Sequence, residues 1–203
     1  MNRKLGLTLL SSAVVAIALA VISDPRSVPA QPVSSINSGH VSVTMMEGDD
    51  DAVIVRKLAK YKTWTLVNPT PVLMDANAAF ACAAVITGNP HASKYISVYV
   101  NQKGQDAMLQ QERPVFPVGS VIVKEKLAYS TASSPELLTV MIKRDKGYDE
   151  NSGNWEYLVL DGSAAKIAQR GRLKSCNGCH IGYPKTDYVT RTYLPEAVRK
   201  ELR

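Results

Sequence analysis

The chain is poor in the residues that build disulfide scaffolds and metal clusters. Its 203 residues include only three cysteines, three histidines, two phenylalanines and two tryptophans. Three cysteines are too few, and odd in number, for a framework of several disulfides. The sequence also contains no internal repeat, which argues against a solenoid. What is present, 45% hydrophobic and 21% charged residues, is typical of one globular domain.

The first 30 residues have the composition of an export signal. Arg3 and Lys4 precede an uncharged apolar run from Leu5 to Ile22, and small residues follow as far as Ala30. We interpret residues 1–30 as a secretory signal peptide; a membrane anchor is the alternative. Either interpretation predicts an exported, periplasmic protein.

The charge of the chain does not indicate a nucleic-acid partner. The net charge is +6, and residues 1–30 hold three basic residues and one acidic residue, so the remainder carries +4. That excess is too small to predict a nucleic-acid-binding surface. Residues 31–48 are small and polar and are predicted to be a linker, which leaves residues 49–203 as the folded domain.

The predicted elements of the domain indicate an α+β fold, mainly an antiparallel sheet with a few flanking helices and a C-terminal haem-attachment segment. An acidic start followed by Val53, Ile54 and Leu58 predicts a helix after residue 50. Short runs rich in β-branched and aromatic residues predict strands within residues 94–101, 119–130, 137–144 and 154–161. Two further helices are expected, within residues 104–111 and 163–174.

Two of the three cysteines and one histidine lie within five positions, in the sequence CNGCH at residues 176–180. Cys-x-x-Cys-His is the attachment signature of c-type haem. One turn of chain lets Cys176 and Cys179 add to the two vinyl groups of one porphyrin, and His180 then supplies an axial nitrogen to the iron. We therefore predict one covalently attached haem c.

Two other interpretations of the cysteine pair are weaker. A zinc site needs about four Cys or His ligands, and the remaining candidates, Cys82, His40 and His91, form no matching pair. A thioredoxin-like redox pair needs a βαβ context, which we do not expect in a C-terminal loop. We expect Cys82 to be a buried free thiol.

The sixth coordination position of the iron is predicted to be open. All six methionines precede the haem signature, so a methionine ligand would have to come from upstream. An open iron coordinates small nitrogen or oxygen species, whereas an iron with two axial ligands mainly transfers electrons. The electron carrier therefore stays as an alternative.

Four sequence blocks give the chain a resemblance to a known family. FPVGSVIVKEKL at 116–127, VMIKRDKGYD at 140–149, GNWEYLVLD at 153–161 and CNGCHIGYPKTDYV at 176–189 occur in the order seen in the cytochrome P-460 family, which includes the cytochromes c′-beta. The resemblance covers roughly residues 50–195. It implies a periplasmic, largely antiparallel-β haem protein that is often a homodimer.

The resemblance also implies a choice between two activities. Cytochromes P-460 oxidise hydroxylamine, pass electrons to a soluble partner, and carry a lysine side chain bonded to the haem. Cytochromes c′-beta lack that bond and bind nitric oxide or carbon monoxide. Lys124 in SVIVKEKL matches the bonded lysine. Because strand neighbours alternate, Lys124 shares a face with Ile122 and Lys126, and a solvent-exposed face is the alternative to a haem bond.

Some residues expected of a hydroxylamine-oxidising member are missing. Ile96 stands near the position where some members have an arginine, and no acidic residue lies between Asp161 and Cys176. A general base for the reaction would have to come from Glu125, Glu156 or Asp161. Lys185, Thr186 and Asp187 match the family and are expected to order the segment after His180.

Overall fold

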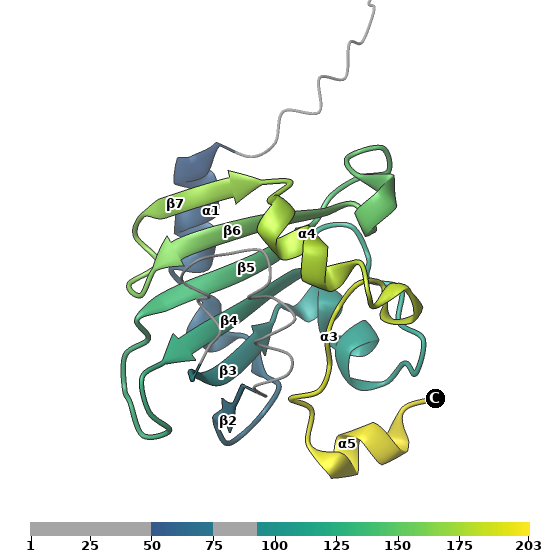
Figure 1. Cartoon of the computed structure of the whole chain (residues 1–203), viewed down its shortest axis with the longest axis horizontal. Coiled ribbons are helices and arrows are strands. Elements are labelled where there is room, and N and C mark those ends of the chain that lie inside the picture. The colour runs from purple at the N-terminus through teal and green to yellow at the C-terminus, as the bar shows by residue number, and fades with distance from the viewer. Residues whose placement is uncertain (1–49, 75–92) are drawn as a thin grey trace, which may run out of the picture. The chain divides into compact units, whose positions relative to one another are not determined.

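The computed structural model describes residues 50–74 and 93–203, which belong to one compact unit, Met46–Arg203 (Figure 1). The predicted signal peptide and linker, and the predictions for His40, Cys82 and His91, lie outside the described residues. Within the described residues, no helix is long and apolar enough to cross a membrane.

An antiparallel sheet forms the centre of the described structure, as predicted. The seven described strands follow the order β1-β3-β4-β5-β6-β7, and β2 also pairs with β3. Their bounds are β1 Thr65–Leu66, β2 Val72–Leu73, β3 Tyr95–Val100, β4 Val121–Leu127, β5 Leu137–Lys143, β6 Trp155–Asp161 and β7 Ile167–Gly171. The described helices are α1 Asp51–Leu58, α3 Gln102–Leu109, α4 Lys174–His180 and α5 Glu196–Glu201, with short 3₁₀ turns at Tyr61–Thr63, Glu150–Ser152 and Pro184–Thr186. The α+β prediction is confirmed.

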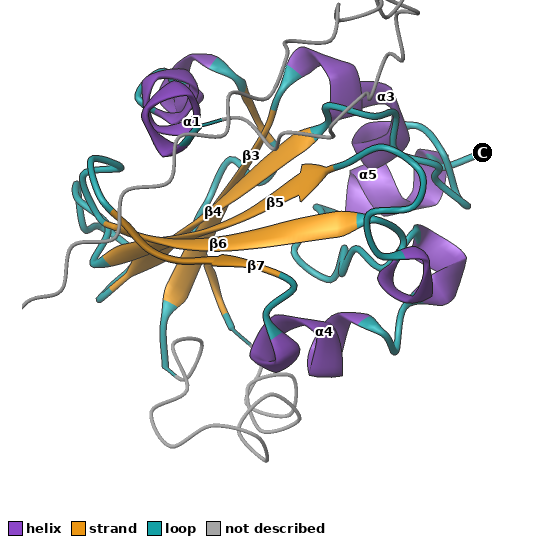
Figure 2. Cartoon of the chain, turned by 90° about the horizontal axis from the view of Figure 1, so that it is seen from above, coloured by secondary structure: helices purple, strands orange, loops and turns teal. Residues whose placement is uncertain are grey.

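The sheet buries both of its faces, because its strands alternate two apolar sets of side chains. Val123, Val140 and Leu158 pack with Ile54 and Leu58 of α1, on what we call the α1 face. The opposite side is the cavity face, whose buried side chains include Val98, Ile122, Met141, Trp155 and Tyr157. Figure 2 shows α1 and α4 on opposite sides of the sheet, with α3 and α5 at one end.

The first helix begins where the acidic residues predicted it. The side chain of Asp50 accepts a hydrogen bond from the Ala52 N–H at 3.4 Å, and Asp51 lies in the first turn, where the helix dipole favours negative charge. The predicted helix near residue 104 is also present as α3, and the Asn101 side chain caps it by accepting from the Gly104 N–H at 3.2 Å.

The helix predicted within residues 163–174 is wrong, because the middle of this segment forms strand β7. The Asp161 carboxylate accepts hydrogen bonds from the N–H groups of Ala165 and Lys166, at 2.9 and 2.8 Å, and closes a tight turn after β6. The turn returns the chain beside β6, where Val159 pairs with Gln169. Pairing with an open strand edge therefore outweighs the helical preference of the local sequence. The cysteine segment, expected to be a loop, is helix α4.

Candidate functional site

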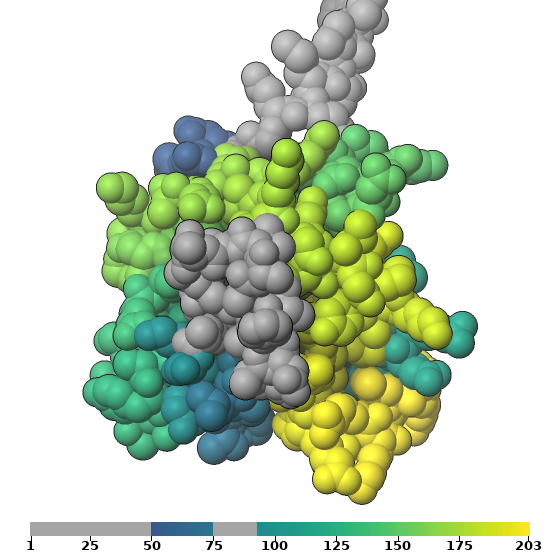
Figure 3. All heavy atoms as spheres, viewed as in Figure 1, coloured from purple at the N-terminus to yellow at the C-terminus, as the bar shows by residue number. Residues whose placement is uncertain are grey.

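A cavity of about 400 Å³ lies between α4 and the cavity face of the sheet, within the size range of small-molecule sites. All four residues predicted as site residues, Lys124, Cys176, Cys179 and His180, line it. The other lining residues are Met74, Ile122, Thr139, Val140, Met141, Tyr157, Leu158, Ser175, Gly178, Gly182, Tyr183, Val189, Thr190, Thr192 and Tyr193. In Figure 3, α4 and the C-terminal segment lie side by side on the surface that faces the viewer.

The two cysteines lie one helical turn apart in α4, so both face the cavity. Cys176 has a free thiol, and burial raises the pKa of this thiol. Cys179 is disulfide-bonded in the structure. A thioether bond at Cys179 would therefore require that this disulfide is reduced to the thiol first.

His180 is held by a single backbone oxygen. Its Nδ1 lies 2.6 Å from the carbonyl oxygen of Tyr188. A carbonyl only accepts hydrogen bonds, so Nδ1 carries the proton and Nε2 keeps its lone pair for a metal. Burial and, second, the charge of Lys124 lower the pKa of His180 to about 4, so the imidazole is neutral at physiological pH.

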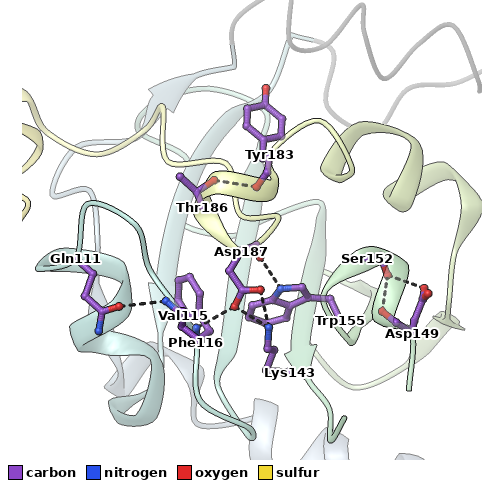
Figure 4. A network of polar contacts seen from close by, with 10 residues as sticks. All are labelled: Gln111, Val115, Phe116, Lys143, Asp149, Ser152, Trp155, Tyr183, Thr186 and Asp187. Atoms are coloured by element: carbon purple, nitrogen blue, oxygen red, sulfur yellow. Dashed lines mark hydrogen bonds and ion pairs between the residues drawn. The ribbon is translucent and has the colours of Figure 1, made fainter. Parts of the chain in front are cut away.

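Asp187 fixes the backbone that presents this carbonyl (Figure 4). Both oxygens of its carboxylate accept from Lys143 Nζ at 2.6 Å, and one also accepts from the Phe116 N–H at 2.9 Å. Its own carbonyl oxygen accepts from Trp155 Nε1 at 2.7 Å. These contacts hold Asp187 and Tyr188 in the left-handed region, at φ of 51° and 63°. The expectation that this segment is ordered after the histidine agrees with these contacts.

Lys124 is buried in β4, between Val98 of β3 and Thr139 of β5. Its exposed fraction is 9%, and Lys126 is fully buried, so the alternative of a solvent-exposed face is wrong. The Lys124 Nζ lies 5.1 Å from the centre of the Tyr193 ring. Burial lowers the pKa of Lys124 to about 8, so a fraction of the amine is neutral and nucleophilic near neutral pH.

Each of the three carboxylates considered as a general base lies away from the cavity. Glu125 accepts from the Tyr61 hydroxyl at 2.5 Å on the α1 face. Glu156 is bound by Arg144 and Arg170, and Asp161 closes the turn before β7. Among the described residues, no carboxylate lines the cavity.

Two aromatic residues outside the predicted site contribute to the cavity. Tyr157 is 2% exposed, and its ring centre lies 5.3 Å from that of His180. Its alternation with Trp155 in a strand fits either the core or the edge of a haem, and from the sequence the core is the preferred interpretation. Tyr193 has no periodic signal, because it lies in the irregular segment between the Pro184–Thr186 turn and α5. Met74 and Met141 also line the cavity, so the alternative of a methionine ligand stays open.

An antiparallel sheet that carries a Cys-x-x-Cys-His helix over a buried cavity defines the class of protein: a cytochrome. The family model for cytochrome P460 matches residues 58–191, which shows that this chain belongs to the cytochrome P460 family. A search of curated proteins gave no match to the chain.

Family membership implies a haem cofactor, and the cavity residues fit one. The thiol of Cys176 and the free nitrogen of His180 face the same space, as does Cys179. A bare metal ion has less support, because the described residues contain no group of three or more His, Cys, Asp or Glu that could hold one. Cys176, Cys179 and His180 are thus the residues that would hold the haem.

Proposed function

We propose that this chain is an exported, mono-haem c-type cytochrome that binds small nitrogen species at an open iron position and oxidises hydroxylamine. When bound, the haem supplies an iron that coordinates nitrogen species and exchanges electrons. The single observation that carries the proposal is the position of Lys124, whose buried amine lines the same cavity as Cys176, Cys179 and His180.

Each of these side chains has a distinct task in the proposal. Cys176 and Cys179 hold the porphyrin by thioether bonds, and His180 binds the iron through Nε2. Lys124 would be joined to the macrocycle by a third covalent bond: its neutral amine would replace a hydrogen on a carbon of the macrocycle, with loss of two protons and with an external two-electron oxidant taking up the electron pair, and a buried amine with a lowered pKa is suited to this attack. Such a bond would distort the macrocycle and change its reduction potential.

Mass spectrometry of protein matured in a haem-attaching host tests these bonds. Proteolysis should give a peptide with haem on Cys176 and Cys179, joined to a second peptide through Lys124. Lys124→Met should remove only the third link and restore an ordinary c-type spectrum. Lys126→Met is the matched control, because Lys126 is a buried lysine on the same strand face and should keep the link. Protein without haem on Cys176 and Cys179 would refute the proposed function, and a wild-type chain without the third link would refute the role of Lys124.

A non-enzymatic binder of nitric oxide, of the c′-beta type, is the second candidate. Oxidation of hydroxylamine releases protons as well as electrons, so the reaction needs a proton acceptor near the substrate. The lack of a carboxylate among the described lining residues is the observation that supports this second candidate. Turnover of hydroxylamine with an artificial electron acceptor would support the enzyme, whereas nitric oxide binding without turnover would support the binder.

The remaining parts of the proposal concern the setting of the protein. The N-terminal segment with Arg3, Lys4 and the following apolar run supports export to the periplasm. Electrons from hydroxylamine would pass to a soluble electron-transfer partner. A homodimer is proposed from family resemblance alone, and the mass of the purified protein in solution would test it.

A further inference from the structure

The hydroxyl group of Tyr157 is a buried polar group without a hydrogen-bond partner in the described structure. Tyr157 lies in β6, opposite Met141 of β5, and its side chain lines the cavity. The residue is 2% exposed, so bulk solvent does not reach the side chain. A buried hydroxyl without a partner is unusual in a folded protein, because its desolvation is not compensated.

The other two buried tyrosines of the described residues each have a contact for their hydroxyl group. Tyr61, which is 4% exposed on the α1 face, donates its hydroxyl proton to Glu125 at 2.5 Å. The hydroxyl of Tyr193 lies 3.9 Å from the sulfur of Met108, which is a weak acceptor. The Tyr157 hydroxyl is thus an available donor in the cavity where the cofactor is expected.

A phenol hydroxyl group keeps its proton near neutral pH, so the Tyr157 side chain offers an O–H donor.

We propose that Tyr157 is a binding residue that donates a hydrogen bond to an oxygen acceptor carried into the cavity, an inference that rests on the haem of the proposed function. Two sources can supply such an oxygen: a carboxylate of the haem itself, or a small oxygen-bearing molecule at the iron. The Tyr157 ring lies beside the ring of His180. A small molecule at the iron would have to bind away from His180, so the place of Tyr157 beside His180 favours the haem carboxylate.

Tyr157→Phe in the haem-loaded full chain tests the proposal, with Tyr61→Phe as the matched control. Both variants remove one hydroxyl group from a buried tyrosine, but Tyr61 lies on the α1 face, away from the cavity. Haem content is measured first, by mass and absorption. Wild-type protein without haem would refute the proposed function, and the test of Tyr157 is made on chains that carry haem.

Two measurements then separate the sources of the oxygen. If Tyr157 donates to a haem carboxylate, Tyr157→Phe should lower the midpoint potential of the ligand-free protein, because the carboxylate loses a donor that offsets its negative charge. If it donates to a molecule at the iron, nitric oxide should dissociate about tenfold faster, as expected for the loss of one hydrogen bond, while the potential stays unchanged.

An unchanged potential together with an unchanged rate of nitric oxide dissociation would overturn the proposal. Equal changes in Tyr157→Phe and Tyr61→Phe would also overturn it, because they would reflect only the loss of a buried hydroxyl group. Tyr157→Met, which also lacks the hydroxyl group but has a flexible side chain, should give the same result as Tyr157→Phe and guards against an effect of altered packing.

Discussion

The buried polar residues that line the cavity differ in their partners from the glutamates buried on the α1 face. Lys124 and Glu125 are neighbours in β4 and point to opposite faces. On the α1 face, Glu125 is bound by the hydroxyl of Tyr61 at 2.5 Å and by Lys62 Nζ at 3.4 Å. On the cavity face, the contact recorded for the Lys124 amine is the ring of Tyr193.

The same contrast recurs in β6. Glu156, on the α1 face, is bound by Arg144 and Arg170, whereas the next residue, Tyr157, has no partner for its hydroxyl group. Glu125 and Glu156 on the α1 face are therefore satisfied within the protein and stabilise the fold. On the cavity face Lys143 is likewise satisfied by Asp187, but the Tyr157 hydroxyl group, in a residue that lines the cavity, costs stability unless a bound group compensates it, which is typical of a binding site.

The largest loss of unfolding free energy is expected from variants that break an ion pair on each face of the sheet. Asp187→Asn removes the carboxylate that binds Lys143, and Glu156→Gln removes the carboxylate that binds both Arg144 and Arg170. All of these side chains are at least three-quarters buried, so each variant should lose about 3 to 5 kcal/mol of unfolding free energy. Urea denaturation at pH 7 measures the loss.

The two variants should differ in their effect on the haem. Only Asp187→Asn disturbs the backbone that holds Nδ1 of His180, so only this variant should change the midpoint potential. An equal change of potential in Glu156→Gln would show that the potential follows general stability and not the segment around Asp187.

The sequence predicted the sheet because its strands carry their own signal. The runs that became β3 to β6 are rich in Val, Ile, Leu and Tyr and alternate between two faces, so their local preference agrees with their place in the sheet. The run that became β7, with Ala168, Gln169 and Arg170, has helix-forming residues, and only the free edge of β6 makes it a strand. Pairing of this kind is not visible in local sequence.

The candidate site was predictable where spacing alone defines the chemistry. Cys176, Cys179 and His180 are adjacent in sequence, and Lys124 was found through its sequence block. Tyr157 and Tyr193 come from segments far from the cysteines, so their place in the cavity depends on tertiary packing. The hydrogen bond from His180 to Tyr188 could not be predicted either, because every residue has a backbone carbonyl and the residue type does not show which one accepts the bond.

A smaller change in unfolding free energy is expected from the buried amine of Lys124 on the cavity face, and this change should depend on pH. The comparison uses chains that cannot attach haem, because both Cys176 and Cys179 are replaced by serine. One such chain keeps Lys124, and the other also carries Lys124→Met. The pKa of Lys124 is about 8 in the folded chain and ordinary, 10.5, in the unfolded chain. Between these values the unfolded state binds more protons, so stability should rise with pH by about 3 kcal/mol.

Lys124→Met should remove the part of the rise between pH 8 and pH 10.5 that comes from Lys124. A separate rise should remain, because burial also lowers the pKa of Lys126. Lys62→Met is the control, because the Lys62 side chain is 54% exposed beside the α1 face and should leave the rise intact. Urea midpoints at several pH values measure the difference. A flat profile in the chain that keeps Lys124 would contradict a buried amine with a lowered pKa.

The smallest loss of unfolding free energy is expected from substitutions of two glycines. Comparing them separates the cost of backbone strain from the effect of disturbing the segment that holds His180. Gly147 and Gly153 both have positive φ, 94° and 69°. An added Cβ at Gly147 meets nothing within 4 Å, whereas at Gly153 it would lie 2.4 Å from the Tyr188 ring. Gly147→Ala should therefore cost about 1 kcal/mol from strain alone, and Gly153→Ala about 2 kcal/mol. Because Gly153→Ala also displaces Tyr188, it alone should change the midpoint potential. Identical losses of stability with an unchanged potential in both variants would mean that the packing of Gly153 against Tyr188 does not hold His180 in place.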